Sequence, residues 1–434
     1  MNPLQRLPVM VPYLAAMFLN AFVDLGHKIV VQNTVFKIYD GTVQVVLTAI
    51  VNALILLPYI LLFTQAGRCS DRFAKQRVMQ GAALVAVLLA LLISLCYYRG
   101  WFWPAFGLTL LMGAQSAFFS PAKYGYLRPL VGPARLARGN GAVQAVTIIA
   151  ILAGTFVFSL LFESRFDRLG AGSPADVLRA IAPLGWLLLL CSLVEVGCAW
   201  LLPQAERVTR ATGLGQQRGV SATLAPLVSR RILLLPVIGL AVFWSASQVV
   251  LATFPAFAKE ALGVTSTVLL QGMLATTGIG ILAGSLTAGR WASRRSDVLL
   301  IALGAAGVSL GLLWLPLLGS VVAHCVNFLF IGFAGGLFIV PLNTVMQFHA
   351  GAHELGRIIA GNNLIQNIAM LGCLVLTAIV AGGGLAPDGL LRGVALATVA
   401  GTLVTVIQLA GRELRTPVAE ALRGRGSAGE RTQL

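Results

Sequence analysis

The sequence has few charged residues. Asp, Glu, Lys and Arg make up 11% of its 434 residues, against about 25% in an ordinary soluble domain. Hydrophobic residues make up 58%. So little charge cannot cover the surface of a soluble fold of this size, and the composition therefore indicates an integral membrane protein.

Sequence signatures of enzymes and of metal sites are also missing. There is no phosphate-binding loop, no HExxH pair and no Ser, His and Asp order in a soluble domain, so we expect no enzyme, no cofactor and no metal. A pump driven by ATP would need a large soluble domain. The six Cys show no disulfide or metal-ligand spacing, and we expect them to pack as small apolar residues.

Hydrophobic runs dominate what is present. We count twelve, each about 20 residues long, which is the length of a helix that crosses a bilayer. They lie at residues 9–36, 43–64, 78–98, 102–124, 140–163, 181–202, 232–258, 266–288, 298–317, 320–345, 359–382 and 389–411. The predicted fold is therefore an all-α integral membrane protein with twelve transmembrane helices.

The excess of positive charge follows the expected topology. The net charge is +16, and a cytoplasmic N-terminus with twelve alternating spans places about 23 of the 31 Lys and Arg in cytoplasmic loops and tails. The charge is explained by the positive-inside rule and by attraction to membrane lipids, so we expect no nucleic-acid partner. Both termini are predicted to be cytoplasmic.

The chain contains an internal duplication at an offset of about 220 residues. The stretch Phe118–Tyr124 reappears as Phe338–Thr344, and Gly139-Asn140 with Gln144 reappears as Gly361-Asn362 with Gln366. We therefore divide the chain into an N-terminal six-helix bundle, a cytoplasmic linker, a C-terminal six-helix bundle and a cytoplasmic tail, at residues 1–202, 203–231, 232–411 and 412–434. Two pseudo-symmetric bundles are the arrangement of the major facilitator fold, whose substrate site lies between them.

The first hydrophobic run carries a polar stripe. Asn20, Asp24, His27, Lys28 and Gln32 recur at spacings of three and four residues, which places them on one face of a helix. Ionisable groups inside a bilayer are costly, so by default they indicate a transport path. The alternative is that Asp24 and Lys28, one turn apart, neutralise each other and only make the helix insertable.

The loop after the second run resembles the loop signature of the major facilitator superfamily. It reads Gly67-Arg68-Cys69-Ser70-Asp71-Arg72, followed by further basic residues. The resemblance implies that a glycine allows close helix contact and that the Asp forms a charge-relay latch with Arg residues. We therefore expect gating roles for Gly67, Asp71, Arg72 and Arg77, with a solvated basic loop as the alternative. The corresponding stretch Ser285–Arg290 lacks the first Gly and the Asp.

Three further motifs resemble a narrower group. They are Phe118-Phe119-Ser120-Pro121-Ala122-Lys123-Tyr124-Gly125, Gly139-Asn140-Gly141 and the helix-one stretch Phe22–Lys28. They are similar to motifs of the lysophospholipid transporter family, including the transporter half of relatives fused to an acyltransferase. The resemblance implies movement of lysophospholipid across the bacterial inner membrane by alternating access. It also implies a monomer with an acyltransferase or acyl-ACP synthetase as its cytoplasmic partner.

Two positions depart from the family pattern. Leu25 replaces the usual Asn after the helix-one Asp, which removes one hydrogen-bond partner from the stripe. The seventh run, Phe243–Phe257, carries no charge, although the family has a basic residue there that is thought to meet the lipid headgroup. The departures indicate that the preferred headgroup differs.

Nine polar residues make up the predicted substrate site. An ammonium and a phosphate of a zwitterionic headgroup would meet Asp24 and Lys28, while apolar side chains accommodate the acyl chain. Lys123 has an alternative role, since it can extend to lipid phosphate at the interface, and amides can bridge membrane helices instead of lining a path. The predicted residues are Asp24, Lys28, Asn20, His27, Lys123, Gln115, Gln248, Asn343 and Gln366.

Two other interpretations stay open. A proton-coupled exporter of hydrophobic drugs or small metabolites would use Asp24 or Glu195 as a titrating group. Glu195 and His324 have no spaced partner in the sequence, and a hydrogen-bonded helix contact is the simpler role for both. The third interpretation is a membrane anchor for a lipid-modifying enzyme, without transport.

Overall fold

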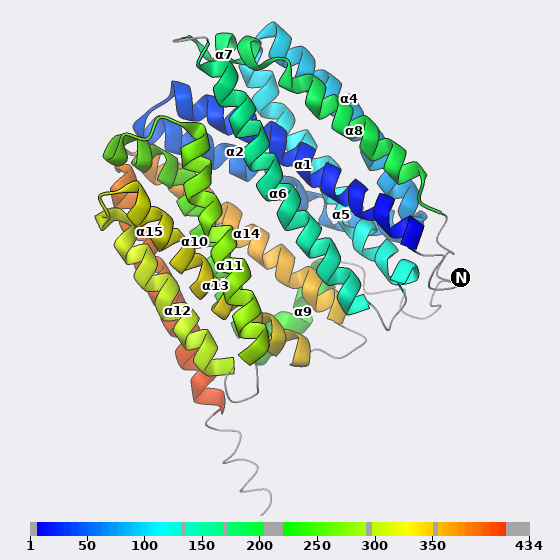
Figure 1. Cartoon of the computed structure of the whole chain (residues 1–434). Helices are drawn as coiled ribbons and strands as arrows, with labels where there is room; N and C mark the ends of the chain where they lie inside the picture. Colours follow the sequence, from blue (N-terminus) through cyan, green and yellow to red (C-terminus); the bar gives the residue numbers. More distant parts are fainter. Residues whose placement is uncertain are drawn as a thin grey trace, which may run out of the picture. The chain divides into compact units, whose positions relative to one another are not determined.

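The computed structural model describes residues 7–131, 136–168, 172–203, 220–291, 297–349 and 355–413. Every regular element in these ranges is a helix (Figure 1). The helices are α1 (Leu7–Ile38), α2 (Gly41–Leu61), α3 (Phe63–Arg72), α4 (Lys75–Arg99), α5 (Phe102–Val131), α6 (Leu136–Phe166), α7 (Pro174–Ile181), α8 (Leu184–Trp200), α9 (Val220–Ser229), α10 (Arg231–Leu262), α11 (Thr267–Trp291), α12 (Asp297–Trp314), η3 (Leu315–Leu317), α13 (Val321–His349), α14 (Leu355–Gly382) and α15 (Pro387–Glu413).

Eleven helices of the described chain are long and apolar enough to cross a membrane, and a twelfth span results if α7 and α8 are taken together. The prediction of an all-helical membrane protein is confirmed. The sixth span differs from the straight helix expected at 181–202, because α7 and α8 meet at an angle of 54°. Pro183 lies at the break, where it supplies no backbone donor to continue the first helix.

The loop signature is also more helical than expected. Helix α2 ends at Leu61, and Phe63–Arg72 forms α3, so the motif begins inside a helix. The chain then turns at Phe73 and Ala74 before α4 begins. Within the predicted linker, residues 220–229 form α9, while residues 204–219 lie outside the described part of the chain.

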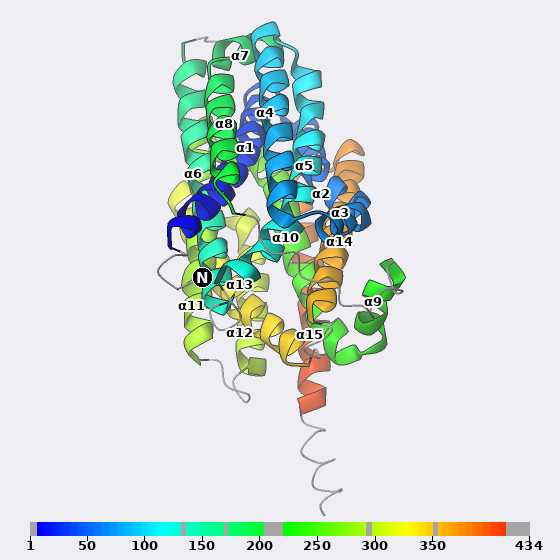
Figure 2. The ribbon, with the colours of Figure 1, turned by 90° about the vertical axis from the view of Figure 1, so that its right-hand side faces the viewer.

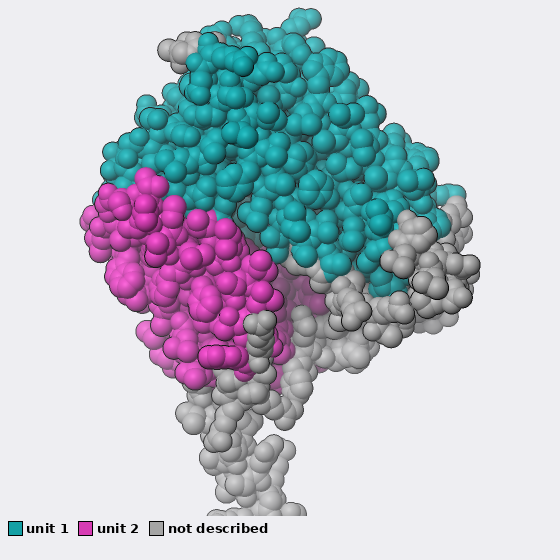
Figure 3. Space-filling model, in the orientation of Figure 1, with its two compact units in different colours: residues 1–220, 248–275, 370–390 teal, residues 221–247, 276–369, 391–434 magenta. Residues whose placement is uncertain are grey.

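Contact clustering divides the chain into two compact units (Figure 3). Unit 1 contains residues 1–220, 248–275 and 370–390, and unit 2 contains residues 221–247, 276–369 and 391–434. The boundaries cut α9, α10, α11, α14 and α15, so these units differ from the two predicted six-helix bundles. The division into bundles stays a prediction.

In unit 1, helices α1, α4, α5, α6 and α8 run side by side (Figures 1 and 2). Gly26 of α1 and Gly154 of α6 allow the two helices to approach closely, because a Cβ at Gly154 would lie 3.2 Å from the backbone oxygen of Phe22 and one at Gly26 would overlap the Phe158 ring. Lipid is as apolar as the core, so dispersion contacts at small residues hold these helices together.

In unit 2, close packing of helices at glycines is more extensive. Gly280 and Gly284 of α11 face Gly332 and Gly336 of α13, and a Cβ at any of the four would overlap the backbone of the other helix. The glycines around residue 332 therefore serve close helix packing.

Candidate functional site

Asn20 of the stripe links α1 to two other helices of unit 1. Its side-chain amide donates to Glu195 Oε1 of α8 at 3.1 Å and to Gln115 Oε1 of α5 at 3.5 Å. Gln115 donates from Nε2 to the backbone oxygen of Ala82 in α4 at 3.2 Å. All three polar side chains are buried. The group that we call the polar cluster consists of Asn20, Asp24, Gln115, Ser116 and Glu195.

Asp24 joins the cluster through Ser116. The Ser116 hydroxyl donates to Asp24 Oδ2 and also lies 3.1 Å from Gln115 Oε1. Asp24 Oδ1 and Glu195 Oε2 are buried and have no hydrogen-bond partner among the described residues. Burying an acceptor without a donor is costly. These two oxygens are therefore the atoms at which the cluster can accept a cationic ligand or a proton.

Lys28 lies one turn beyond Asp24, yet the two do not pair. Its half-buried ammonium makes no hydrogen bond and no ion pair with any residue that the structure describes. Asp24 accepts instead from Ser116. The spacing correctly placed the two residues on one helix, but the self-neutralising pair is not formed. An uncompensated cation in a membrane helix is the kind of group that marks a ligand path.

His27 and Gln32 lie apart from the cluster. His27 is fully buried, with Nδ1 2.8 Å from the Tyr97 hydroxyl and Nε2 3.0 Å from the backbone oxygen of Ala105. Both ring nitrogens are thus occupied by α4 and α5. Gln32 donates to Asn52 Oδ1 of α2 at 3.1 Å. The contacts of both residues are bridges between helices of the kind that stabilise membrane bundles.

Lys123 lies near the end of α5, half-buried. Its ammonium is 5.2 Å from the centre of the Tyr124 ring, a cation–π distance. Its backbone oxygen accepts from the Tyr13 hydroxyl of α1 at 2.8 Å. Of the remaining predicted residues, Gln248 of α10 is half-buried. The side chains of Asn140 and Gln144, which belong to the duplicated motif, lie outside the described part of the chain.

The predicted residues of unit 2 form bonds within their own helices. Asn343 donates to the backbone oxygen of Ile339 at 3.0 Å, and Gln366 donates to Asn362 Oδ1 at 2.7 Å. Each bond spans one helical turn. His324 contacts the backbone oxygens of Ser320 and Leu315 at 2.8 and 3.0 Å, which is the helix contact that the sequence favoured.

The predicted gating residues gather around α3 and the turn that follows it. Arg72 is exposed, with its guanidinium 5.7 Å from the centre of the Phe73 ring, and Arg77 is exposed on α4. A Cβ at Gly67 would meet no atom within 4 Å, so the expected close helix contact is not seen here. The Asp71 side chain lies outside the described residues.

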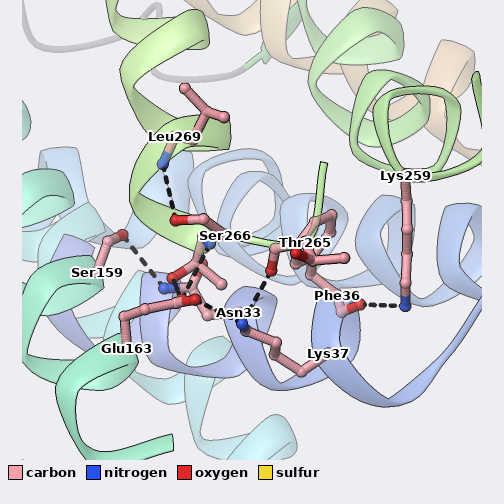
Figure 4. A network of polar contacts seen from close by, with 10 residues as sticks. Asn33, Phe36, Lys37, Ser159, Glu163, Lys259, Thr265, Ser266 and Leu269 are labelled. Carbon is pink, nitrogen blue, oxygen red and sulfur yellow. Dashed lines mark hydrogen bonds and ion pairs between the residues drawn. The ribbon is translucent and has the colours of Figure 1, made fainter. Parts of the chain in front are cut away.

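A second polar network, which the sequence did not reveal, lies at the other end of α1 (Figure 4). Lys37 Nζ lies 2.6 Å from Glu163 Oε1 of α6 and donates to the backbone oxygen of Thr265 at 2.8 Å. Glu163 Oε2 accepts from the Thr267 backbone amide at 3.0 Å and from its hydroxyl. Helices α1 and α6 are thus tied to the connection between α10 and α11.

Lys259 of α10 completes this network. Its ammonium lies 2.6 Å from Asp40 Oδ1 and donates to the backbone oxygens of Phe36 and Tyr39 at 2.9 and 3.3 Å. These oxygens lie at the C-terminal end of α1, where the helix dipole favours a cation. The residues that we call the α1 latch are Lys37, Asp40, Glu163, Lys259, Thr265 and Thr267, and all belong to unit 1.

Metal ligation is not indicated by this geometry. Within the described ranges, no three His, Cys, Asp or Glu side chains gather closely enough to hold a metal ion. The six Cys are free.

The sequence profile of the Major Facilitator Superfamily matches residues 13–373, which is well over half of the chain. The chain belongs to the major facilitator superfamily. This major facilitator protein is 30% identical over 341 residues to the lysophospholipid transporter LplT of Photorhabdus laumondii, with 76% of this chain and 79% of the relative covered. It is 29% identical over 330 residues to LplT of Yersinia pestis, with 74% and 75% covered.

Solved structures support the same fold. This major facilitator protein matches the crystal structure of the nucleoside transporter NupG (D323A mutant) with a TM-score of 0.62 at 13% identity, covering 93% of this chain and 99% of that one. A POT family transporter in complex with a thioalcohol-conjugated peptide matches with a TM-score of 0.68 at 11% identity, covering 92% and 95%. At these identities the likeness concerns the fold alone.

Proposed function

We propose that this major facilitator protein is a lysophospholipid transporter. The proposal is supported by relatives that carry this name along about three quarters of the chain. Helix-one chemistry supports it as well. A lysophospholipid presents a phosphate, which a lysine can bind, and in its zwitterionic forms an ammonium, which a carboxylate can bind.

The observation that carries the proposal is the separation of Asp24 from Lys28. Lys28 has an ammonium without a protein partner among the described residues, and Asp24 keeps one carboxylate oxygen free of donors. A headgroup that bridges the two would compensate both charges in one binding event. With Leu25 in place of an amide and no charge in Phe243–Phe257, these two residues supply most of the headgroup recognition, and Lys123 is the next cation along the path.

The transport cycle follows from two gates. The α1 latch holds one end of unit 1, and the residues Gly67, Asp71, Arg72 and Arg77 form the gate at the other end. Opening the latch breaks the Lys259–Asp40 ion pair and the bond from the Thr267 amide to Glu163, because these contacts join residues of the two predicted bundles. We infer that the two six-helix bundles rock around Asp24 and Lys28, with one gate closed at a time.

We place the protein in the bacterial inner membrane as a multi-pass monomer with both termini in the cytoplasm. The charge distribution supports this orientation. A cytoplasmic acyltransferase or acyl-ACP synthetase would add the second acyl chain to the delivered lysophospholipid. No enzymatic step by the transporter itself enters this scheme, since its relatives and structural neighbours are transporters.

Reconstitution tests the proposal. The full chain is placed in proteoliposomes, and the transbilayer movement of labelled lysophosphatidylethanolamine is followed. Movement well above that in protein-free liposomes, with saturation at high substrate, is expected. A rate equal to that of the empty liposomes would refute the proposed function.

One observation favours a second function, proton-coupled export of hydrophobic compounds. Ser116 has one hydroxyl hydrogen but lies against two acceptors, Asp24 Oδ2 and Gln115 Oε1. A proton on Asp24 would satisfy both contacts, because Asp24 would donate to Ser116 and Ser116 to Gln115. Transport of drugs that dissipates an imposed proton gradient, and that stops in Asp24→Asn, would support this function over the lipid one.

A further inference from the structure

A cavity of about 560 Å³ lies along the first half of α4 and the middle of α5, within unit 1. Its walls are apolar apart from Arg77 at one end and Gln115 in the interior. Small residues of both helices line the cavity and leave space in it: Gly81 and Ala82 from α4, and Ala114 from α5. A Cβ at Gly81 would meet no atom within 4 Å.

The dimensions of this cavity suit an acyl chain. Its lining runs along α4 from Arg77 to Leu89, which is roughly 18 Å at the helical rise of about 1.5 Å per residue. One leaflet of a bilayer has a hydrocarbon thickness of about 15 Å. The rim includes Phe73, Val85 and Leu111, which are 53%, 46% and 48% exposed. Val85 and Leu111 lie on the membrane spans α4 and α5, whereas Phe73 lies in the turn before α4, so the exposed rim extends from the end of the span to membrane depth.

The charges near the cavity indicate that the headgroup of the bound lipid is anionic. Arg77 lies at one end of the cavity, and Arg68 and Arg72 are exposed on α3 nearby in the chain. The Arg77 guanidinium makes no hydrogen bond or ion pair with the residues that the structure describes. A guanidinium binds phosphate through two parallel hydrogen bonds, so an anionic headgroup fits where the acyl chain ends.

We propose that this cavity is a binding site for an anionic bilayer phospholipid, with one acyl chain between α4 and α5 and its phosphate on Arg77. Neither Asp24 nor Lys28 lines the cavity, which meets the polar cluster only at Gln115, so the lipid proposed here is distinct from the cargo. It lies against Phe73 and Cys69, next to the predicted gate, so the bound lipid supports the α3–α4 turn.

The test is native mass spectrometry of the purified full chain in detergent, titrated with phosphatidylglycerol. The wild-type protein is expected to retain one phosphatidylglycerol. Gly81→Leu places a side chain in the cavity, where its Cβ meets no atom within 4 Å, and is expected to bind phosphatidylglycerol at least about tenfold more weakly. Gly107→Leu in α5 is the matched control, since a Cβ there also meets no atom within 4 Å and Gly107 lies outside the cavity lining. It should bind like the wild type.

The Arg77→Gln variant tests the contribution of the lipid headgroup to binding separately from that of the acyl chain. The exposed side chain can be replaced without disturbing the fold, and the variant should lose most of the preference of the wild type for phosphatidylglycerol over phosphatidylcholine. Equal binding of phosphatidylglycerol by the wild type and Gly81→Leu would overturn the proposal. Displacement of the bound lipid by an equimolar amount of lysophosphatidylethanolamine would also overturn it, because the cavity would then be a cargo site.

Discussion

The predicted site residues of the two halves of the chain make different hydrogen bonds. In the first half, Asn20 bonds to residues of α5 and α8, so three helices share one buried cluster. In the second half, the predicted residues Asn343 and Gln366 bond within their own helices, and helices are joined there by other residues, as in the bond from Asn327 of α13 to the backbone oxygen of Gly311 in α12. Bonds between helices fix the register of a bundle, whereas bonds within a helix leave its neighbours free to shift. The difference supports our proposal that substrate recognition lies in the first half.

The largest effect is expected from the helix-one pair. Asp24→Asn and Lys28→Ala should each abolish uptake of labelled lysophospholipid in spheroplasts, because each removes one charge that meets the headgroup. Expression in the membrane should stay normal, as judged by immunoblot. If both variants transport like the wild type, the stripe is structural and recognition lies elsewhere.

A smaller effect is expected when the polar cluster loses Asn20, and this effect is on the free energy of unfolding. Asn20→Leu leaves Glu195 Oε1 and Gln115 Oε1 without the Asn20 donor and should lower the free energy of unfolding by about 1–2 kcal/mol. Asn343→Leu is the matched control in α13, since it removes one bond within a helix, and its effect should stay below about 0.5 kcal/mol. Denaturant unfolding in detergent measures both. Equal losses would remove the contrast between the halves.

Weakening the α1 latch should raise the solvent accessibility of a buried residue beside it. Glu163→Gln weakens the ion pair with Lys37, so a cysteine introduced at the buried Val264 should react several-fold faster with a water-soluble maleimide. A cysteine at the exposed Ala261 is the control and should react at the same rate in both proteins. An unchanged rate at Val264 would show that the latch does not hold this end closed.

Weakening the predicted gate around α3 should raise cysteine labelling near α3 and leave labelling at the α1 latch unchanged. Asp71→Ala is expected to raise the labelling of cysteines introduced on the side of α3, because the charge-relay contact is lost. Labelling at Val264 should then stay at its low value. A rise at both ends would argue against two gates that close in turn.

The smallest effect is expected from the amides of the second half. Gln366→Leu removes a bond to Asn362 on the same helix, so lysophospholipid uptake should stay within about twofold of the wild type. Loss of uptake in this variant, at normal expression, would mean that the second half also contributes to recognition and that the halves are more alike than their hydrogen bonds indicate.

The fold could be predicted from the sequence because each membrane span is a continuous apolar run, which can be recognised without knowledge of distant contacts. Pro183 was the visible sign that the sixth span bends, although the run of hydrophobic residues around it suggested one helix. Helical spacing also placed Asp24 and Lys28 on one helix. It could not show that they do not pair, since the pairing is decided by Ser116, which lies on another helix.

Contacts between residues that are far apart in the sequence could not be predicted from helical spacing. Glu195 is a single acid in an apolar run, and its partner Asn20 is 175 residues away. Lys37 meets Glu163 and Thr265 at separations of 126 and 228 residues. The periodicity of one helix carries no information on these contacts. The usable signal was the cost of each isolated charge, which predicts that a partner exists without saying which residue it is.

Binding of the headgroup tests the central claim most directly. The affinity of the purified full chain for lysophosphatidylethanolamine is compared with that for a monoacylglycerol of the same acyl chain, in the wild type and in Lys28→Ala. The wild type should prefer the lysophospholipid by at least about tenfold, which corresponds to one charge-assisted contact, and Lys28→Ala should lose that preference. An unchanged preference in Lys28→Ala would contradict the assignment of Asp24 and Lys28 as the headgroup site.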